Sequence, residues 1–412
     1  MTTLRVAMIM DDFFPSSGGI GRAVQTQLEE LTAMGHEVTL VVPDRYLEKP
    51  RIGRVIETPT FYVSGLPAHL SILRHGDRRA RAIASSAPFD VVHTHTERGA
   101  LVLGAKIAGA QRIPHLHSFH ANIAGAHQTV RAAVFGTLLY QLLIIPVLRR
   151  AAGRPYARPR LPTMHQETGG LFARLDWAGF AAIASQVDGY TVPSPFMRDL
   201  IQASARRRVT GWVVPTGVNR VMLEALDQGV PRRTDGRTRF LAVGRLAKEK
   251  RLDVLLRAFR RANLPDAELV LVGDGDQRNV LKRLATGLDV DFRGHVPSVR
   301  RIAQELLGAD ALVLASYRFD SQALVIAEAV AAGLPVLYCD DRLSVGVSDE
   351  SALLTGPDIK SMAEGLRQLT DAATRERMGR AARSLRPSLM PERTAAALVV
   401  TYTELIERNT RG

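Results

Sequence analysis

The stretch SYRFDSQALVIAEAVAAGLPVL, from Ser316 to Leu337, decides how the rest of the chain is interpreted. It follows an apolar run, Ala311 to Ala315, which is typical of a buried strand. From Leu324 onward the spacing of apolar residues predicts a buried helix that ends at Gly333. A second apolar run follows, so the segment is predicted to be strand, polar loop, helix, turn and strand. This unit builds parallel sheets that are covered by helices.

Two carboxylates in this stretch, Asp320 and Glu328, are candidates for a binding site. In an open parallel sheet, ligands bind beyond the carboxyl ends of the strands, where helix N-termini present free N–H groups. We therefore expect Asp320 at the mouth of a pocket and Glu328 about two helical turns deeper. The alternative is structural: one acid caps the helix and the other is a solvated or paired residue of it.

The same alternation of strands and helices occurs in two series along the chain. The first series starts with a predicted strand from Arg5 to Met10, and the second with a strand at Phe240. Between them, the polar span from Asn219 to Arg239 is rich in Gly, Pro and charge, and is predicted to be an interdomain linker. The sequence therefore predicts an α/β protein with two doubly wound domains.

Composition limits the classes of function. The chain has 412 residues, 46% of them hydrophobic, and a net charge of +13, which suits nucleic acid, an anionic membrane surface or phosphorylated substrates. Aromatic residues make up 6%, which argues against a protein that stacks single-stranded bases. The single Cys339, expected to be a packed thiol, excludes an intrachain disulfide and a cysteine-rich zinc site. Since the first ten residues do not resemble a signal peptide, we expect a cytoplasmic protein.

A glycine-rich loop, Asp11 to Gly21, separates the first predicted strand from its helix. Gly18 and Gly19 in this loop suit a phosphate held at a helix N-terminus. It is not the dinucleotide fingerprint, because position 24 is Val where the third glycine is required. A plain tight turn explains the loop equally simply.

Histidines follow two further predicted strands. His93 and His95 come shortly before Glu97. The stretch from His117 to His120 again places histidines at the end of a predicted strand, one helix later in the chain. They suit the lining of a pocket, where an imidazole donates to a substrate oxygen. The alternative, a zinc site, lacks a cysteine or a close acidic cluster to complete its ligands.

An apolar segment from Ala132 to Leu148 breaks the alternation and is followed by basic residues. At 17 residues it is shorter than the roughly 20 that span a bilayer. Two interpretations stay open: docking on anionic lipid, or a buried core helix before a solvated loop. The basic residues are Arg149, Arg150, Arg154, Arg158 and Arg160.

Arg245 and Lys250 flank the end of the first strand in the second series. The planar fork of Arg suits phosphate oxygens, and Lys supplies a point charge that suits a diphosphate. The alternative is a pair of ordinary surface cations near a helix start.

Taken together, these residues resemble glycosyltransferase family 4 of the GT-B fold, whose members are retaining transferases that use a nucleotide sugar. The Gly18-Gly19 loop resembles the family's glycine loop, which faces the donor phosphates. His120 falls where the family has an active-site histidine near the transferred sugar. Arg245 and Lys250 match the pair that holds the donor diphosphate.

The resemblance implies two Rossmann-like domains facing across a cleft. We expect an acceptor-side domain in residues 1–215 and a nucleotide-sugar domain in residues 216–392. A last helix in residues 393–412 is expected to pack back on the first domain. No cofactor and no metal is implied, since the nucleotide sugar, a UDP- or GDP-hexose, is the substrate.

Asp320 and Glu328 match the family's paired acids, of which the first contacts sugar hydroxyls and the second ribose hydroxyls. Asp320 replaces the usual Glu, and Ser321-Gln322-Ala323 replaces the usual Gly-Phe-Gly. Position 251 is Arg where the family has Gly. The full set of donor-binding residues that the resemblance implies is Gly18, Gly19, Arg245, Lys250, Val296, Asp320, Ser321, Gln322, Ala323, Leu324 and Glu328.

The acceptor side is similar to bacterial diacylglycerol glycosyltransferases. This implies transfer of glucose or mannose to a lipid or glycolipid by a protein bound peripherally to the inner face of the cell membrane, with no nucleic-acid partner. A soluble or phosphatidylinositol acceptor is an alternative, and a basic polyanion-binding protein without catalysis is an alternative from another class. The sequence sets neither the acceptor hydroxyl nor the oligomeric state. The residues implied on this side are His95, Glu97, His117, Arg149, Arg150 and Arg154.

Overall fold

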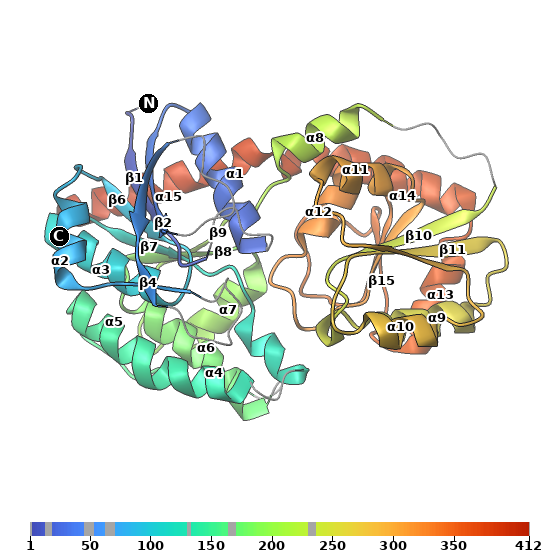
Figure 1. Cartoon of the computed structure of the whole chain (residues 1–412), viewed down its shortest axis with the longest axis horizontal. Helices are drawn as coiled ribbons and strands as arrows, with labels where there is room; N and C mark the ends of the chain where they lie inside the picture. Colours follow the sequence, from blue (N-terminus) through green and yellow to red (C-terminus); the bar gives the residue numbers. More distant parts are fainter. Residues whose placement is uncertain are drawn as a thin grey trace. The chain divides into compact units, whose positions relative to one another are not determined.

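The computed structural model describes residues 2–12, 19–44, 53–61, 71–129, 133–163, 170–229 and 236–411. The chain forms two compact units (Figure 1). Unit 1 comprises Met1–Thr216 and Glu392–Gly412, and unit 2 comprises Gly217–Pro391. Each junction lies one residue from the expected domain boundary.

Unit 1 is built on a seven-stranded sheet in which the described strand pairs are all parallel. Its strand order is β3-β2-β1-β6-β7-β8-β9. The first strand pairs on both sides, since Val6 lies opposite both Val38 and Val91. The strands are β1 (Arg5–Ile9), β2 (Glu37–Pro43), β3 (Arg54–Thr58), β6 (Val91–Thr94), β7 (His115–Ser118), β8 (Gly189–Val192) and β9 (Gly211–Val213).

Alternate side chains of β1 enter two different cores, as the period of a strand requires. Val6 and Met8 pack with helices α1 and α15, whereas Ala7 and Ile9 pack with α2 and α3. Unit 1 is therefore doubly wound, as predicted. Its helices include α1 (Gly19–Ala33), α2 (Asp77–Ala84), α3 (Gly99–Gln111), α6 (Gly170–Ala184), α7 (Pro195–Ser204) and α15 (Pro391–Arg411), and a short pair of strands is β4 (Thr60–Phe61) with β5 (Ile72–Leu73).

The C-terminal helix α15 completes the core of unit 1. Its apolar residues Ala395, Leu398, Tyr402 and Leu405 recur at helical spacing and are at most 2% exposed. They pack in one cluster with residues of β1, β2 and α1. The last helix expected from the sequence therefore forms and packs within this unit.

The apolar segment of unit 1 is mostly exposed. It forms α4 (Ala133–Leu139), one π-helical turn (Tyr140–Ile144) and α5 (Ile145–Ala152). Phe135 is 75% exposed and Leu142 is 69% exposed, so the interpretation as a buried core helix is wrong for these residues. The described residues hold one helix, Ala133–Ala152, that is long and apolar enough to cross a membrane. Only 17% of its most apolar window is buried, and a single such helix is weak evidence for a span.

Unit 2 has a six-stranded sheet whose described strand pairs are parallel, in the order β12-β11-β10-β13-β14-β15. Helices α8, α11, α12 and α14 share one core with it, and α9, α10 and α13 share the other. The strands are β10 (Thr238–Val243), β11 (Ala267–Val272), β12 (Val290–Gly294), β13 (Ala311–Leu314), β14 (Val336–Tyr338) and β15 (Ala352–Leu354). The helices are α8 (Arg220–Asp227), α9 (Leu252–Ala262), α10 (Arg278–Leu284), α11 (Val299–Leu307), α12 (Leu324–Ala331), α13 (Ile359–Gln368) and α14 (Ala372–Leu385).

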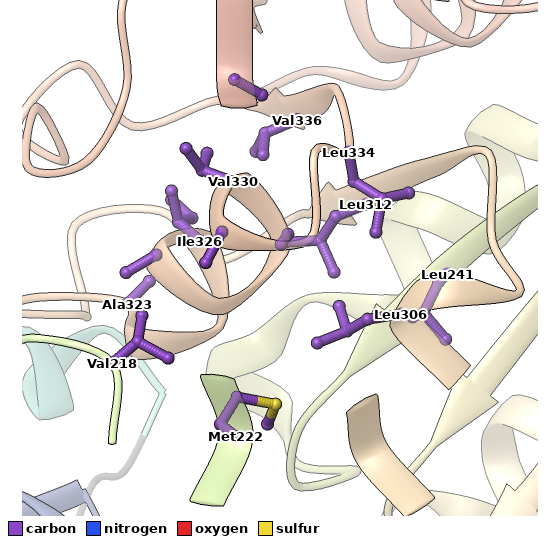
Figure 2. Packing of buried hydrophobic residues seen from close by; sticks show 14 of the residues in the cluster. Val218, Met222, Leu241, Leu306, Leu312, Ala323, Ile326, Val330, Leu334 and Val336 are labelled. Carbon is purple, nitrogen blue, oxygen red and sulfur yellow. The ribbon is translucent and has the colours of Figure 1, made fainter. Parts of the chain in front are cut away.

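Helix α12 lies at the centre of the first of these cores, as the opening stretch predicted. Figure 2 shows Ile326 and Val330 packed among Leu312, Leu334 and Val336. The chain leaves the helix at Gly333, whose φ of 77° lies in the left-handed region that glycine adopts at low cost.

The predicted linker from Asn219 to Arg239 is wrong in its first part, because that part folds as α8. The side chain of Asn219 caps the helix by accepting from the backbone N–H of Met222 at 2.8 Å. Met222 and Leu226 are buried in the core of unit 2. The helical spacing of these apolar residues outweighs the charges around them. Residues 230–235 lie outside the described residues.

Candidate active site

Lys250 and Asp320 lie together on loops that follow two neighbouring strands. Strands β10 and β13 pair directly, so the loops after their carboxyl ends are adjacent. Lys250 Nζ donates to Asp320 Oδ1 at 2.6 Å, and Ser316 Oγ donates to Asp320 Oδ2 at 2.6 Å. The side chains of Lys250 and Asp320 are 22% and 12% exposed. Asp320 is therefore held through both oxygens, in a place that a ligand still reaches.

The loop that carries Asp320 is anchored from the next strand. Asp340, which follows β14 and is fully buried, accepts from the backbone N–H of Arg318 at 2.6 Å. Arg318 has a φ of 57°, a left-handed conformation that requires such support in a residue with a side chain. Its guanidinium also pairs with Asp341 at 3.1 Å. These contacts fix the backbone immediately before Asp320.

Arg245 presents its charge to solvent from the loop after β10. Its side chain is 65% exposed and pairs with Glu249, which is only 7% exposed. A side chain at Gly273 or Gly275 would overlap the backbone of Gly244 or Leu246, because the loop after β11 packs against this loop. Arg245 is therefore mounted on a firmly packed turn, with its guanidinium accessible to an anion.

The replacement of glycine by Arg251 has a conformational consequence. Arg251 has a φ of 49°, which explains why glycine suits this position. Its guanidinium donates to the carbonyl oxygens of Pro357 at 2.6 Å and of Ala315 at 3.4 Å. These bonds tie the Lys250 loop to the strand end that precedes Ser316.

The other donor-side residues fall in several places. Glu328 is 5% exposed on α12, and Ser321 is 9% exposed. Ala323 is buried and half-buried Val296 packs on the same core cluster, whereas Gln322 and Leu324 are half-buried. Gly19 is the first residue of α1 and Gly18 lies outside the described residues. Direct bonds thus join Lys250 to Asp320, while Arg245 is bonded to Glu249.

The histidines of unit 1 form a connected buried cluster. His95 Nδ1 and His120 Nε2 lie 3.0 Å apart, within hydrogen-bond distance, and their rings are stacked. Burial lowers the pKa of His120 to about 4, although the charge of Glu97 opposes this shift. Burial also lowers the pKa of His95 well below its usual value. Both imidazoles are therefore neutral at neutral pH, and one donates to the other.

His93 is held from the C-terminal helix, a link that the sequence pattern did not reveal. Its Nδ1 lies 2.7 Å from the Tyr402 hydroxyl, and its Nε2 lies 2.6 Å from Ser118 Oγ. Burial lowers the pKa of His93 well below the usual range. Helix α15 thus takes part in fixing the strand that leads to His95 and Glu97.

The remaining acceptor-side residues lie in two groups. His117 is fully buried on β7, with its Nε2 3.9 Å from Oε1 of Glu97. Arg149 lies 3.7 Å from the ring centroid of Tyr156, and Arg154 pairs with Asp188 at 2.5 Å. Arg150 is exposed at the end of α5. Within the described ranges, no group of three or more His, Cys, Asp or Glu side chains is arranged to hold a metal ion.

Two family models match the chain. One, described as Glycosyltransferase Family 4, matches residues 17–220, and the other, described as Glycosyl transferases group 1, matches residues 224–385. The chain belongs to the family 4 glycosyltransferases. This confirms the resemblance that the motifs suggested.

Relatives of this family 4 glycosyltransferase include lipid-modifying enzymes. An alpha-monoglucosyldiacylglycerol synthase of Streptococcus pneumoniae is 25% identical over 354 residues, which cover 81% of this chain and 70% of the relative. A GDP-mannose-dependent alpha-(1-6)-phosphatidylinositol dimannoside mannosyltransferase of Mycobacterium tuberculosis is 27% identical over 97% of this chain and 96% of its own length. Sucrose-phosphate synthase from Thermosynechococcus elongatus matches with a TM-score of 0.70 at 20% identity, over 98% of this chain and 100% of that chain, which supports the GT-B fold alone.

Proposed function

We propose that the protein transfers a hexose, glucose or mannose, from a UDP- or GDP-sugar to a lipid acceptor at the inner face of the cell membrane. Family membership supports glycosyl transfer, and the named activities of the relatives support a lipid acceptor. The observation that carries the donor side is the pairing of Lys250 with Asp320, on a loop after β10 that also carries the exposed guanidinium of Arg245.

In the proposed reaction, the bond between the sugar and the diphosphate breaks while the acceptor oxygen bonds to the sugar. Negative charge grows on the leaving diphosphate, and Arg245 and Lys250 offset it. Because these cations supply the stabilisation, the reaction is proposed to need no metal ion. Asp320 would contact sugar hydroxyls while it keeps Lys250 in place.

We propose that transfer retains the anomeric configuration by attack on the same face. Both oxygens of Asp320 are already hydrogen-bonded, to Lys250 and Ser316, which disfavours a nucleophilic role for this carboxylate. The acceptor's proton would then pass to the leaving phosphate oxygen. His120, neutral and held by His95, would hydrogen-bond a sugar hydroxyl.

The exposed apolar segment supports work at a membrane surface. Phe135, Leu139 and Leu142 are each more than half exposed, and Arg149 and Arg150 follow them in the chain. Apolar side chains that enter the lipid interface beside cations that attract anionic headgroups give peripheral binding. The segment would therefore bring the catalytic unit to its acceptor.

The test is transfer from UDP-glucose and from GDP-mannose to vesicles that contain diacylglycerol, glucosyldiacylglycerol or phosphatidylinositol. The last acceptor is included because a relative is named for a phosphatidylinositol mannoside. We expect a glycolipid product with the donor's anomeric configuration, and undiminished turnover in EDTA. No product with any pair would contradict the proposal, and an inverted product would contradict the retaining mechanism alone.

A further inference from the structure

Two buried polar atoms of unit 1 approach each other without making a hydrogen bond. Oε1 of Glu97 and Nε2 of His117 are 3.9 Å apart, and neither has a hydrogen-bond partner in the described part of the chain. Leaving a buried polar atom unpaired costs about 1–3 kcal/mol. Two such atoms side by side are therefore expected to serve a ligand.

The proton on His117 can be assigned from its surroundings. The carboxylate of Glu97 favours a proton on Nε2, because a bare lone pair there would face negative charge. Nδ1 is then an acceptor and takes the hydroxyl proton of Thr94, which lies 2.8 Å away. Thr94 in turn accepts from Nε2 of His115 at 2.9 Å. Each of these two contacts then joins one donor to one acceptor, and the longer contact of Thr94 Oγ1 with the carbonyl oxygen of Leu116, at 3.4 Å, receives no proton.

This arrangement presents a donor and an acceptor to the same point. Nε2 of His117 and Oε1 of Glu97 are 3.9 Å apart, so an oxygen atom can lie about 2.8 Å from both of them, at hydrogen-bond distance from each. A carbonyl oxygen would be repelled by the carboxylate, and an ammonium group would face the N–H of His117. A hydroxyl group, like a water molecule, both accepts from His117 and donates to Glu97, so a lipid hydroxyl could take the place of a bridging water here.

Tyr140 connects this point to the exposed apolar segment. Its hydroxyl is a third buried polar atom without a hydrogen-bond partner among the described residues. Burial raises the pKa of Tyr140 well above its usual value, and the charges of Glu97 and Asp176 raise it further, so these carboxylates act on its hydroxyl. Tyr140 begins the π-helical turn that carries Leu142 and Leu143, which are 69% and 54% exposed. Tyr140 thus links the charge of Glu97 to the turn whose leucines are exposed.

We propose that Glu97 and His117 form a recognition site for one hydroxyl group of the lipid acceptor. This inference rests on the proposed function, and it assigns no proton transfer to Glu97. The Glu97 side chain as a whole is 12% exposed, so a ligand can reach the side chain that carries the buried Oε1 atom. The site would select an alcohol over the same lipid without its hydroxyl.

The test compares two short-chain lipids, dihexanoylglycerol and its deoxy analogue, in which hydrogen replaces the free hydroxyl. Their dissociation constants are measured by calorimetry in the presence of UDP, so that no turnover occurs. For the wild-type protein we expect the alcohol to bind about tenfold more tightly, as one net hydrogen-bonding contact provides.

The variants His117→Asn and His117→Gln form a matched pair. Asn keeps a polar group for Thr94 but has none at the position of Nε2, so the ratio of dissociation constants should fall to about one. Gln places an amide near the position of Nε2 and should retain most of the ratio. If His117→Asn fails to fold, Glu97→Ala tests the same ratio from the other side.

A wild-type ratio near one, or a tenfold ratio that survives both His117→Asn and Glu97→Ala, would overturn the inference. Neither result bears on the transfer assay, which tests the proposed function separately. Absence of transfer together with a hydroxyl-dependent ratio would instead leave a lipid-alcohol binding site and remove the proposed reaction.

Discussion

The ammonium group of Lys250 lies 2.6 Å from Oδ1 of Asp320, although 70 residues separate them in the chain. The pair exists because β10 and β13 are neighbours in the sheet. It leaves Lys250 fixed in a partly buried position, where its charge is less screened than on an open surface. This preorganisation is what the proposed stabilisation of the leaving diphosphate requires.

Lys250→Ala should lower kcat/KM for the nucleotide sugar by a factor of about 100, because it removes a cation from the developing phosphate charge. Lys248→Ala is the matched control, since Lys248 is exposed two residues away and has no assigned role. Steady-state kinetics of both variants would check this. Equal rates for Lys250→Ala and the wild-type protein would remove the assigned role.

Asp320→Glu restores the acid that is usual in the family, yet it should lower kcat/KM by about tenfold. The carboxylate is already bonded to Lys250 and Ser316, so an extra methylene displaces it from at least one of these partners. Loss of one such bond corresponds to a tenfold effect. Turnover that equals or exceeds that of the wild-type protein would show that the shorter acid is not fitted to this site.

The free energy of unfolding should fall as the pH is lowered from 6.5 toward 4. Burial holds the pKa of His120 at about 4, below the usual 6.5, so in this window the unfolded chain binds a proton that the folded protein does not. His93 and His95 shift in the same direction. Each such histidine contributes at most about 1.4 kcal/mol per pH unit.

Urea unfolding of the wild-type protein and of His120→Asn at pH 7 and pH 5 would check this dependence. The variant should lose less stability between the two pH values, because it has one titrating imidazole fewer. The carboxylate of Glu97 opposes the shift at His120, so an identical pH dependence in both proteins would show that folding leaves the pKa of His120 unshifted.

Tyr402→Phe should lower the free energy of unfolding by about 1–2 kcal/mol, because it leaves the buried Nδ1 of His93 without its partner. Thr403→Ser on the exposed side of the same helix serves as the control. Denaturant unfolding followed by tyrosine and tryptophan fluorescence would measure both. A change no larger than that of the control would mean that the hydroxyl does not stabilise the folded state.

Replacing Leu139 and Leu142 with serine should weaken binding to anionic vesicles by at least about tenfold, since each leucine that enters the interface contributes roughly 1–3 kcal/mol. Val400→Ser is the control, because Val400 is 57% exposed on α15, away from this segment in the sequence. Sedimentation with phosphatidylglycerol vesicles would report the difference. Equal loss in the control would show that exposed apolar area alone, rather than this segment, governs binding.

Local sequence patterns predicted those elements whose stability comes from a regular apolar face. Helix α12 starts at the predicted residue, Leu324, and the chain leaves it at Gly333, because its buried apolar residues keep helical spacing. The predicted linker that became α8 shows the opposite case. There, the Gly, Pro and charged residues of the surrounding span are typical of a loop, so the short helix was not predicted. Packing of its apolar residues in the core of unit 2 stabilises it.

The candidate site was predictable as a set of residues but not as a set of contacts. Parallel strands place their carboxyl ends at one edge, so loops that follow them were expected to hold Lys250 and Asp320. Their pairing, and that of His93 with Tyr402, depends on strand order and on side-chain direction over long separations. The positive φ of Arg251 likewise depends on distant carbonyl partners, which no local pattern reveals.

Helix α15 also bears on how the polypeptide is made. Its residues up to Leu405 close the core around β1, so unit 1 cannot reach its native packing until this helix has been synthesised. The residues of unit 2 form one continuous segment and leave the ribosome earlier. During translation, the domain encoded second is therefore able to fold first.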